Sequence, residues 1–334
     1  MGTRRIPQLG ATYHEWLRAH PTVATAFRDT IEEMLVDAGV SFDRVVARVK
    51  EWRSLKAKAM QRTPEGDFRY PDPWNDIKDI VGIRITTYFS ADIPVVLDIL
   101  GKQFTVLKSV DKAAETRIAG GFGYGSHHLV LQVPNDSEDL AEFRGLIFEV
   151  QVRTVLQHAW AEFEHDIRYK GTDVHDPRID RAFALAAGLI ELADQQFDQI
   201  ARIQGEAPTT GDDVELSAET LPGVLAMLVG KRFPQSRSEY YSWLEDILAV
   251  NGITTVSELR DLLDDTDIAA VEGALKYQFV PGQVRIIDDL LLRRFGNAHI
   301  ERTQGLGKHA SQRAGRLRKR LGVMVDAGIA VDVD

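Results

Sequence analysis

Apolar residues recur at helical spacing along the first part of the chain. The pattern runs through residues 27–35 and resumes from residue 45 to residue 60, so it predicts that residues 8–62 are helical. Prolines and glycines in residues 63–78 then interrupt the pattern and indicate a loop.

Three segments after that loop are predicted β-strands, at residues 80–89, 126–133 and 147–153. A helical pattern with a proline in its first turn occupies residues 94–104. Two longer helical patterns follow the third strand, at residues 154–170 and 178–203. Helices and strands are therefore mixed along one domain.

The last third of the chain is predicted to form a separate, mainly helical domain. Residues 206–213 are polar and rich in turn formers, so we predict a linker there between domains at residues 1–205 and 214–334. Thr255 and Glu258 have the spacing of a capping box. Helices are expected to begin just after Ser236 or Ser238, after Thr255 and after Pro281.

Composition narrows the class of protein. The 334 residues suggest about two domains. No apolar run approaches the roughly 18 residues of a membrane span, and no apolar stretch follows the basic N-terminus as in a signal peptide. The lack of cysteine excludes disulfides and zinc–thiolate sites, so we expect a cytoplasmic protein. A net charge of −10 argues against bulk nucleic acid as the main partner, but it allows a local basic pocket.

One predicted strand places three polar side chains on a single face. Side chains alternate along a strand, so Glu149, Gln151 and Arg153 share one face. The other face must belong to the core and carries Phe148, Val150 and Val152. A carboxylate, an amide and a guanidinium in a row could form the floor of a polar cleft. Alternation alone favours the simpler interpretation, a half-exposed strand whose charges face water.

Asp79 directly precedes the predicted strand at residues 80–89. A carboxylate at a strand end can hold Mg²⁺, and Asp79 with Glu149 on a neighbouring strand would form a metal-binding pair for phosphate chemistry. Taken alone, Asp79 is better explained as an ordinary polar residue at a strand end.

A run of basic residues lies within one predicted helical stretch and includes a serine: Arg48, Lys50, Arg53, Ser54, Lys56 and Lys58. Its two ends are about three helical turns apart, so they face the same side of a helix. Such a ladder could bind a triphosphate. A charge run on a helix is more often a solvated face.

Tyr124 lies between two glycines, shortly before a predicted strand. A tyrosine exposed by such small neighbours can stack on a base. His127 and His128 follow it, and adjacent strand residues point to opposite faces. We therefore assign no metal to the two histidines.

Together and in this order, these residues resemble the synthetase domain of the RelA/SpoT family, the enzymes that make the alarmones ppGpp and pppGpp. The small single-domain synthetases of the family are the most similar. The matching blocks are RVKEWRSLKAKAM (48–60), DIVGIRI (79–85), GYGSHH (123–128), EVQVRTVLQHAWAEFEH (149–165) and Tyr169-Lys170. The resemblance implies an α+β fold of the nucleotidyltransferase-like kind, with a mixed sheet flanked by helices.

The resemblance also implies an activity, a GTP diphosphokinase that transfers the β,γ-pyrophosphate of ATP to the 3′-hydroxyl of GDP or GTP. Asp79 and Glu149 would be catalytic and hold Mg²⁺. Carried over in the same way, the ATP phosphates would be bound by Arg48, Lys50, Ser54 and Lys58. The guanine nucleotide would be bound by Tyr124, His128, Gln151 and Arg153. Members of the family often form homo-oligomers.

The loop before Tyr124 departs from the family pattern, which reads D-Y-I-x-x-P-K-x-N-G-Y. Residues 113–124 read AAETRIAGGFGY, so the Pro-Lys pair is missing and Phe122 replaces the asparagine. Other acceptors therefore stay open, either an adenine nucleotide or the 3′ end of tRNA, as in toxic family members. A catalytically inactive module that senses nucleotides or a partner is a further alternative, although the intact Asp79 and Glu149 argue against it.

Residues 302–320 are strongly basic and contain no acidic residue. The basic residues are Arg302, Lys308, Arg313, Arg316, Arg318, Lys319 and Arg320. This density could bind tRNA or an acidic protein partner and give the C-terminal domain a regulatory role. A solvated helix that balances an acidic chain is the favoured alternative.

Overall fold

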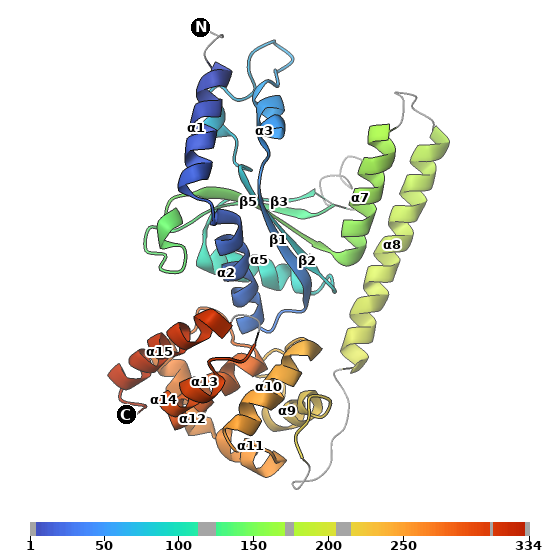
Figure 1. Cartoon of the computed structure of the whole chain (residues 1–334). Helices are drawn as coiled ribbons and strands as arrows, with labels where there is room; N and C mark the ends of the chain where they lie inside the picture. The colour runs from blue at the N-terminus through green and yellow to red at the C-terminus, as the bar shows by residue number, and fades with distance from the viewer. Residues whose placement is uncertain (1–4, 113–124, 171–176, 205–214, 308–309, 331–334) are drawn as a thin grey trace. The chain divides into compact units, whose positions relative to one another are not determined.

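The computed structural model describes residues 5–112, 125–170, 177–204, 215–307 and 310–330 (Figure 1). The chain divides into two compact units. Unit 1 contains Met1–Glu33 and Phe42–Phe197, and unit 2 contains Met34–Ser41 and Asp198–Asp334. The predicted linker, 206–213, lies outside the described residues, and the predicted domain boundaries stay a prediction. No helix in the described ranges is both long and apolar enough to cross a membrane.

Unit 1 is built on a mixed sheet of five strands in the order β1-β2-β5-β4-β3. The strands are β1 (Phe42–Val49), β2 (Val81–Thr87), β3 (Thr105–Asp111), β4 (His127–Gln132) and β5 (Ile147–Thr154). β2 and β5 run parallel at the centre, and the other neighbouring pairs are antiparallel. The predicted fold class, a mixed sheet flanked by helices, is confirmed.

Helices flank this sheet on both of its faces (Figure 1). They are α1 (Arg5–Ala19), α2 (Val23–Asp37), α3 (Trp52–Ala59), α4 (Pro73–Asp76), α5 (Asp92–Gln103), a short 3₁₀ helix (Ala141–Phe143), α7 (Val155–Lys170) and α8 (Pro177–Gln204). The last residues of α2, from Met34, and of α8, from Asp198, belong to unit 2. Phe148 on β5 is fully buried, and its ring meets Phe27 of α2 at 4.8 Å and Phe104 at 5.1 Å. Val150 and Val152 are also fully buried, as the alternation predicted. The apolar face of β5 thus anchors the core and leaves the other face polar.

The prediction of a continuous helical region over residues 8–62 is wrong for residues 42–49, which form β1. The valines of this segment alternate as a strand requires, because Val45 is buried and Val46 is exposed. β-Branched residues also fit a pleated surface better than a helix. The basic run is therefore divided, with Arg48 on β1, Lys50 just after it and Lys58 on α3. The edge strand β3 was not predicted, and it lacks an alternating pattern because nearly all of its residues are exposed.

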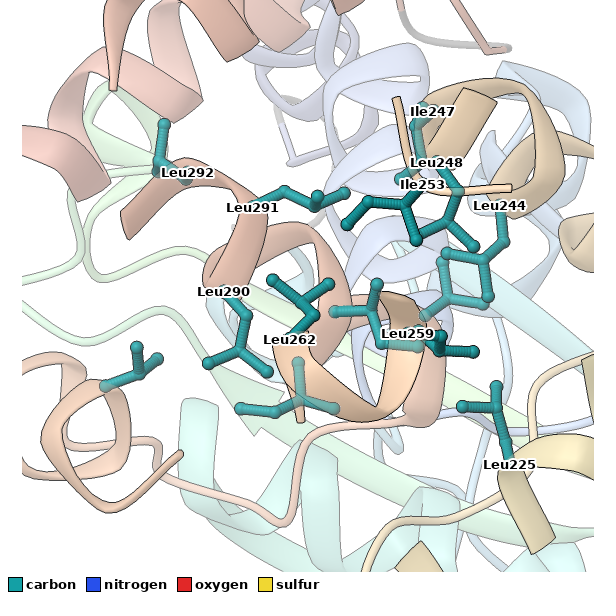
Figure 2. Packing of buried hydrophobic residues seen from close by; sticks show 14 of the residues in the cluster. Leu225, Leu244, Ile247, Leu248, Ile253, Leu259, Leu262, Leu290, Leu291 and Leu292 are labelled. Atoms are coloured by element: carbon teal, nitrogen blue, oxygen red, sulfur yellow. The ribbon is translucent and has the colours of Figure 1, made fainter. Parts of the chain in front are cut away.

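Unit 2 is helical, with α13 (Gln283–Phe295) buried along most of its length. The surrounding helices are α9 (Leu221–Val229), α10 (Ser238–Val250), α11 (Val256–Leu262), α12 (Asp265–Leu275), α14 (Asn297–Thr303) and α15 (Ala310–Asp326). Figure 2 shows Leu290 and Leu291 of α13 beside leucines of α10 and α11. The helix starts predicted at Ser238, Thr255 and Pro281 are confirmed to within two residues.

Buried charges also hold unit 2 together. Asp288 of α13 accepts hydrogen bonds from Arg313 of α15 at 2.5 and 3.1 Å, and His299 of α14 lies 3.0 Å from the same carboxylate. Arg320 pairs with Asp289 at 3.3 Å. Two arginines of the predicted basic segment, Arg313 and Arg320, are therefore internal counterions of unit 2 rather than part of a solvent-facing binding surface.

Residues 34–41 complete unit 2 from a distant part of the sequence. Asp37 is hydrogen-bonded to Arg285, and its carbonyl accepts the backbone N–H of Gly282 at 2.7 Å. A Cβ atom at Gly282 would lie 2.7 Å from the backbone of Gly39. Only glycine allows this close approach.

The capping box of α11 gives a direct test of local stability. The Thr255 side chain accepts the N–H of Glu258, and the Glu258 carboxylate accepts the N–H of Thr255 at 3.0 Å. We expect Thr255→Ala to destabilise unit 2 by about 1 kcal/mol, because a helix N–H loses its acceptor. The change in the free energy of unfolding is measured by chemical denaturation in which hydrogen exchange of the α11 amides is the readout. Ser257→Ala is the control, since it removes an exposed hydroxyl from the first turn of the same helix, and an equal loss in both variants would contradict the assignment.

Candidate active site

The polar face of the sheet collects polar and charged side chains from the three strands β1, β2 and β5. Strand pairing places Gly82 opposite Glu149, Arg84 opposite Gln151 and Arg48 opposite Gly82. Because paired residues point to the same side of a sheet, these side chains share one face. They form part of a cleft of about 160 Å³ lined by Val46, Arg48, Lys50, Asp79, Gly82, Ile83, Arg84, Glu149 and Gln151. The small Gly82 leaves the floor of the cleft open between two charged neighbours.

Asp79 lies at one end of the cleft and is held by two lysines. Its Oδ2 atom is 2.8 Å from Lys50 Nζ and 2.8 Å from Lys58 Nζ. Its Oδ1 atom is buried and has no hydrogen-bond partner. Burial alone would raise the pKa of Asp79, but the hydrogen bonds from the two lysines outweigh it and hold the pKa below its usual value. Asp79 is therefore ionised at neutral pH.

Glu149 is the second carboxylate of the cleft. Its Oε1 atom accepts the Gln151 side-chain N–H at 2.9 Å and lies 3.4 Å from His128 Nδ1. The interaction with His128 lowers the pKa of Glu149, against the effect of burial and of the nearby Asp79 charge. The two carboxylates are thus close enough to interact, and both are ionised.

A second charged cluster lies further along the same face, beside α7. Glu162 of α7 is 3.2 Å from Arg84 and 3.4 Å from Arg153. Burial and the neighbouring Arg84 lower the pKa of Arg153 to about 10, so it keeps its charge at neutral pH. Burial, followed by repulsion from Arg153 and Arg84, lowers the pKa of His158, which is therefore neutral. This end of the face is net positive.

The structure brings together most of the residues that the sequence predicted. Five of them line the cleft: Arg48, Lys50, Asp79, Glu149 and Gln151. Lys58 and His128 join through their contacts with the two carboxylates. Ser54 is exposed on α3 and does not line the cleft. Arg153 shares the face but contacts Glu162, and Tyr124 lies outside the described residues.

Sequence reasoning missed Arg84, which lines the cleft from β2. The signal was available, because Arg84 alternates with the buried Ile83 and Ile85 and so had to share the polar face. Glu162 was also missed. Its role depends on how the helix α7 packs against β2 and β5, which strand alternation does not predict.

The donor atoms of the site can be compared with those that Mg²⁺ prefers. Mg²⁺ in phosphate-transfer sites uses one or two carboxylates, keeps several waters and completes its shell with substrate phosphates. Asp79 offers a buried oxygen without a partner, and Glu149 offers a second ionised carboxylate. The part of the chain described by the structure holds no cluster of three or more acidic or histidine ligands. These two carboxylates therefore fit a magnesium ion whose other ligands are waters and substrate phosphates.

Two ionised carboxylates among several cations on one sheet face form a site whose chemistry suits phosphate transfer. Comparison with known families agrees. Residues 47–174 match the family described as "Region found in RelA / SpoT proteins". The chain therefore carries a RelA/SpoT domain over these residues.

Two curated relatives come from Bacillus subtilis. GTP pyrophosphokinase YjbM is 29% identical over 167 residues, which cover 48% of this chain and 72% of the relative. GTP pyrophosphokinase YwaC is 30% identical over 139 residues, which cover 42% of this chain and 64% of the relative. Both alignments leave about half of this chain unmatched.

Solved structures with a similar fold include small alarmone synthetase 1 from Bacillus subtilis. It has a TM-score of 0.46 and 23% identity, and the match covers 59% of this chain and all of that one. A GTP pyrophosphokinase family protein from Streptococcus pneumoniae has the same TM-score and identity, over 57% of this chain and 92% of that one.

Proposed function

We propose that this protein is an ATP-dependent pyrophosphokinase that makes (p)ppGpp and AMP from ATP and GDP or GTP. The observation that carries the proposal is the pair of ionised carboxylates, Asp79 and Glu149, beside Lys50, Lys58 and Arg48 on one sheet face. The RelA/SpoT domain at residues 47–174 and the two pyrophosphokinase relatives support the same activity. We also propose that the protein acts in the cytoplasm, as the lack of cysteine leads us to expect.

The reaction joins the 3′-oxygen of the acceptor to the β-phosphorus of ATP. The bond between the α,β-bridging oxygen and the β-phosphorus breaks, and AMP leaves with its electron pair. The hydroxyl proton must be removed, and Glu149 is the ionised base available in the cleft for that step. Mg²⁺ held by Asp79 and Glu149 would neutralise charge that develops on the phosphate oxygens.

The cations of the cleft position the donor. Lys50, Lys58 and Arg48 surround the carboxylate pair and can bind the triphosphate oxygens. Gln151 and His128 hold Glu149 through its Oε1 atom, which fixes the direction of the base. Phosphate transfer depends largely on such positioning and on charge stabilisation.

Acceptor identity is the finer part of the proposal. The guanine-stacking role of Tyr124 rests on the resemblance, and its loop is where the chain departs most from the family. A tRNA acceptor would require cationic surface for the phosphate backbone. Arg313 and Arg320 of the basic segment are instead engaged with buried carboxylates. Exposed residues of the same segment include Arg302, Arg318 and Lys319. We favour a free guanine nucleotide because both curated relatives are named GTP pyrophosphokinases.

An acceptor screen tests this proposal. The full chain is incubated with Mg²⁺, γ-labelled ATP and, in parallel, GDP, GTP, ADP or deacylated tRNA. We expect AMP release together with a labelled 3′-pyrophosphorylated guanine nucleotide, because the site holds a base and a donor-binding set of cations. If label appeared only on tRNA or only on an adenine nucleotide, the proposed guanine acceptor would be wrong. If no acceptor led to AMP release, the proposed pyrophosphokinase activity itself would be rejected.

A further inference from the structure

The negative charge of Asp79 is neutralised by two lysines, although Asp79 is also a proposed metal ligand. A single carboxylate oxygen accepts two ammonium groups, each at 2.8 Å, while the other oxygen has no partner. The three side chains are only 14% (Lys50), 28% (Lys58) and 17% (Asp79) exposed, so water screens them weakly. Both ammonium groups therefore compete with a divalent cation for the Asp79 carboxylate.

The lysines reach Asp79 from fixed backbone positions. The Lys50 N–H is bonded to the Ile80 carbonyl at 2.8 Å, and its own carbonyl accepts the Tyr13 hydroxyl at 3.0 Å. Lys58 lies in the last turn of α3, with its ammonium 5.8 Å from the centre of the Tyr70 ring. A change of partner therefore needs only a rotation of each flexible side chain, without movement of the backbone.

A triphosphate is a stronger partner for these lysines than one carboxylate oxygen. It carries several negative charges and offers many oxygens to an ammonium group. When both lysines bind it, Asp79 loses its counterions and becomes available to a cation. The nucleotide thus creates the metal site, and by thermodynamic linkage the metal strengthens nucleotide binding by the same factor.

We propose that Lys50 and Lys58 are internal counterions that occupy Asp79 in the nucleotide-free protein and transfer to the triphosphate, so that metal and nucleotide bind cooperatively. This inference rests on the proposed function, because it takes ATP as the polyphosphate ligand. It adds that the free protein binds the metal weakly by itself. The metal therefore enters the cleft with the nucleotide or after it.

Metal binding without nucleotide tests the inference. Mn²⁺ is titrated into the full chain and its binding is followed by electron paramagnetic resonance, with no ATP or acceptor present. We expect Lys58→Gln to bind Mn²⁺ about 10-fold more tightly than the unmodified protein, a size usual for coupling between sites. Lys50→Gln should act in the same direction, and adding Asp79→Asn to Lys58→Gln should remove the gain.

Lys56→Gln is the matched control, because Lys56 is an exposed lysine on the same helix that takes no part in the Asp79 ion pairs. An equal gain with Lys56→Gln, or no gain with either cleft lysine, would overturn the inference. The readout needs no turnover. A protein that fails the acceptor screen can therefore still support the inference, and an active enzyme can still refute it.

Discussion

Replacing Glu149 by glutamine is expected to lower pyrophosphate transfer by about 100-fold or more, the usual size of a lost general base. Glutamine has nearly the same shape, so the loss comes from the missing negative charge. Glu149 is kept ionised by His128 and Gln151, and no other carboxylate lines the cleft apart from Asp79 among the described residues. The rate of AMP formation at saturating ATP measures the effect.

Glu142→Gln is the control for this variant, because it removes an exposed charge from the short 3₁₀ helix of the same unit. It should keep full activity. Asp79→Asn should lose activity as Glu149→Gln does, since it removes the other carboxylate. A Glu149→Gln protein that keeps most of its activity would contradict both the proton-accepting and the metal-binding role of Glu149.

The second large effect concerns Asp288 in unit 2. Asp288→Asn should destabilise this unit by about 3–5 kcal/mol, the cost of leaving a buried partner charge unpaired. Arg313 donates two hydrogen bonds to this carboxylate, at 2.5 and 3.1 Å, and both residues are buried. Hydrogen exchange in α13 and α15 measures the loss, with the strands of unit 1 as an internal reference.

The pH dependence of this contribution has a defined sign. Burial raises the pKa of Asp288, but Arg313 and His299 outweigh it and hold the pKa far below the usual aspartate value. A carboxyl group whose pKa is lowered in the folded state stabilises the fold at any pH above its unfolded value. Its contribution is therefore complete at neutral pH and is lost as the pH falls below about 4 towards the folded pKa.

Asp265→Asn provides the comparison for the Asp288 variant. Asp265 also pairs with an arginine, Arg232, at 2.9 Å, but its side chain is 93% exposed. Such a surface pair contributes about 1 kcal/mol or less. Similar losses in the two variants would show that the buried network has no special weight. Combining Asp288→Leu with Arg313→Met should recover much of the loss, since no unpaired charge remains between these two positions.

Strand alternation predicted the central part of the fold. The polar and apolar faces of β5 were defined by its sequence alone, because each second residue must enter the core. β1 was mistaken for a helix, since a short valine-rich segment followed by a real helix gives a mixed periodicity. The alternation of Arg44, Val45 and Val46 becomes clear only when β2 provides the pairing partner.

The candidate site was predictable as a set of residues but not as a geometry. Asp79 and Glu149 were identified through the family blocks, whereas the shared ion pair of Asp79 with Lys50 and Lys58 was not. That contact depends on where β1 ends relative to α3, which no local pattern encodes. The position of Arg313 was not predictable for a similar reason, because the carboxylate that it neutralises lies 25 residues away in the sequence, on another helix.

Unit 2 draws one of its segments, residues 34–41, from near the start of the chain, and this has a consequence for synthesis. Asp37 and its partner Arg285 are 248 residues apart. At roughly 5–20 residues per second, about 12 to 50 seconds pass between the addition of the two residues. All five strands of unit 1, the last ending at Thr154, are added before Arg285 exists. Residues 34–41 are therefore without their packing partners in unit 2 during most of translation.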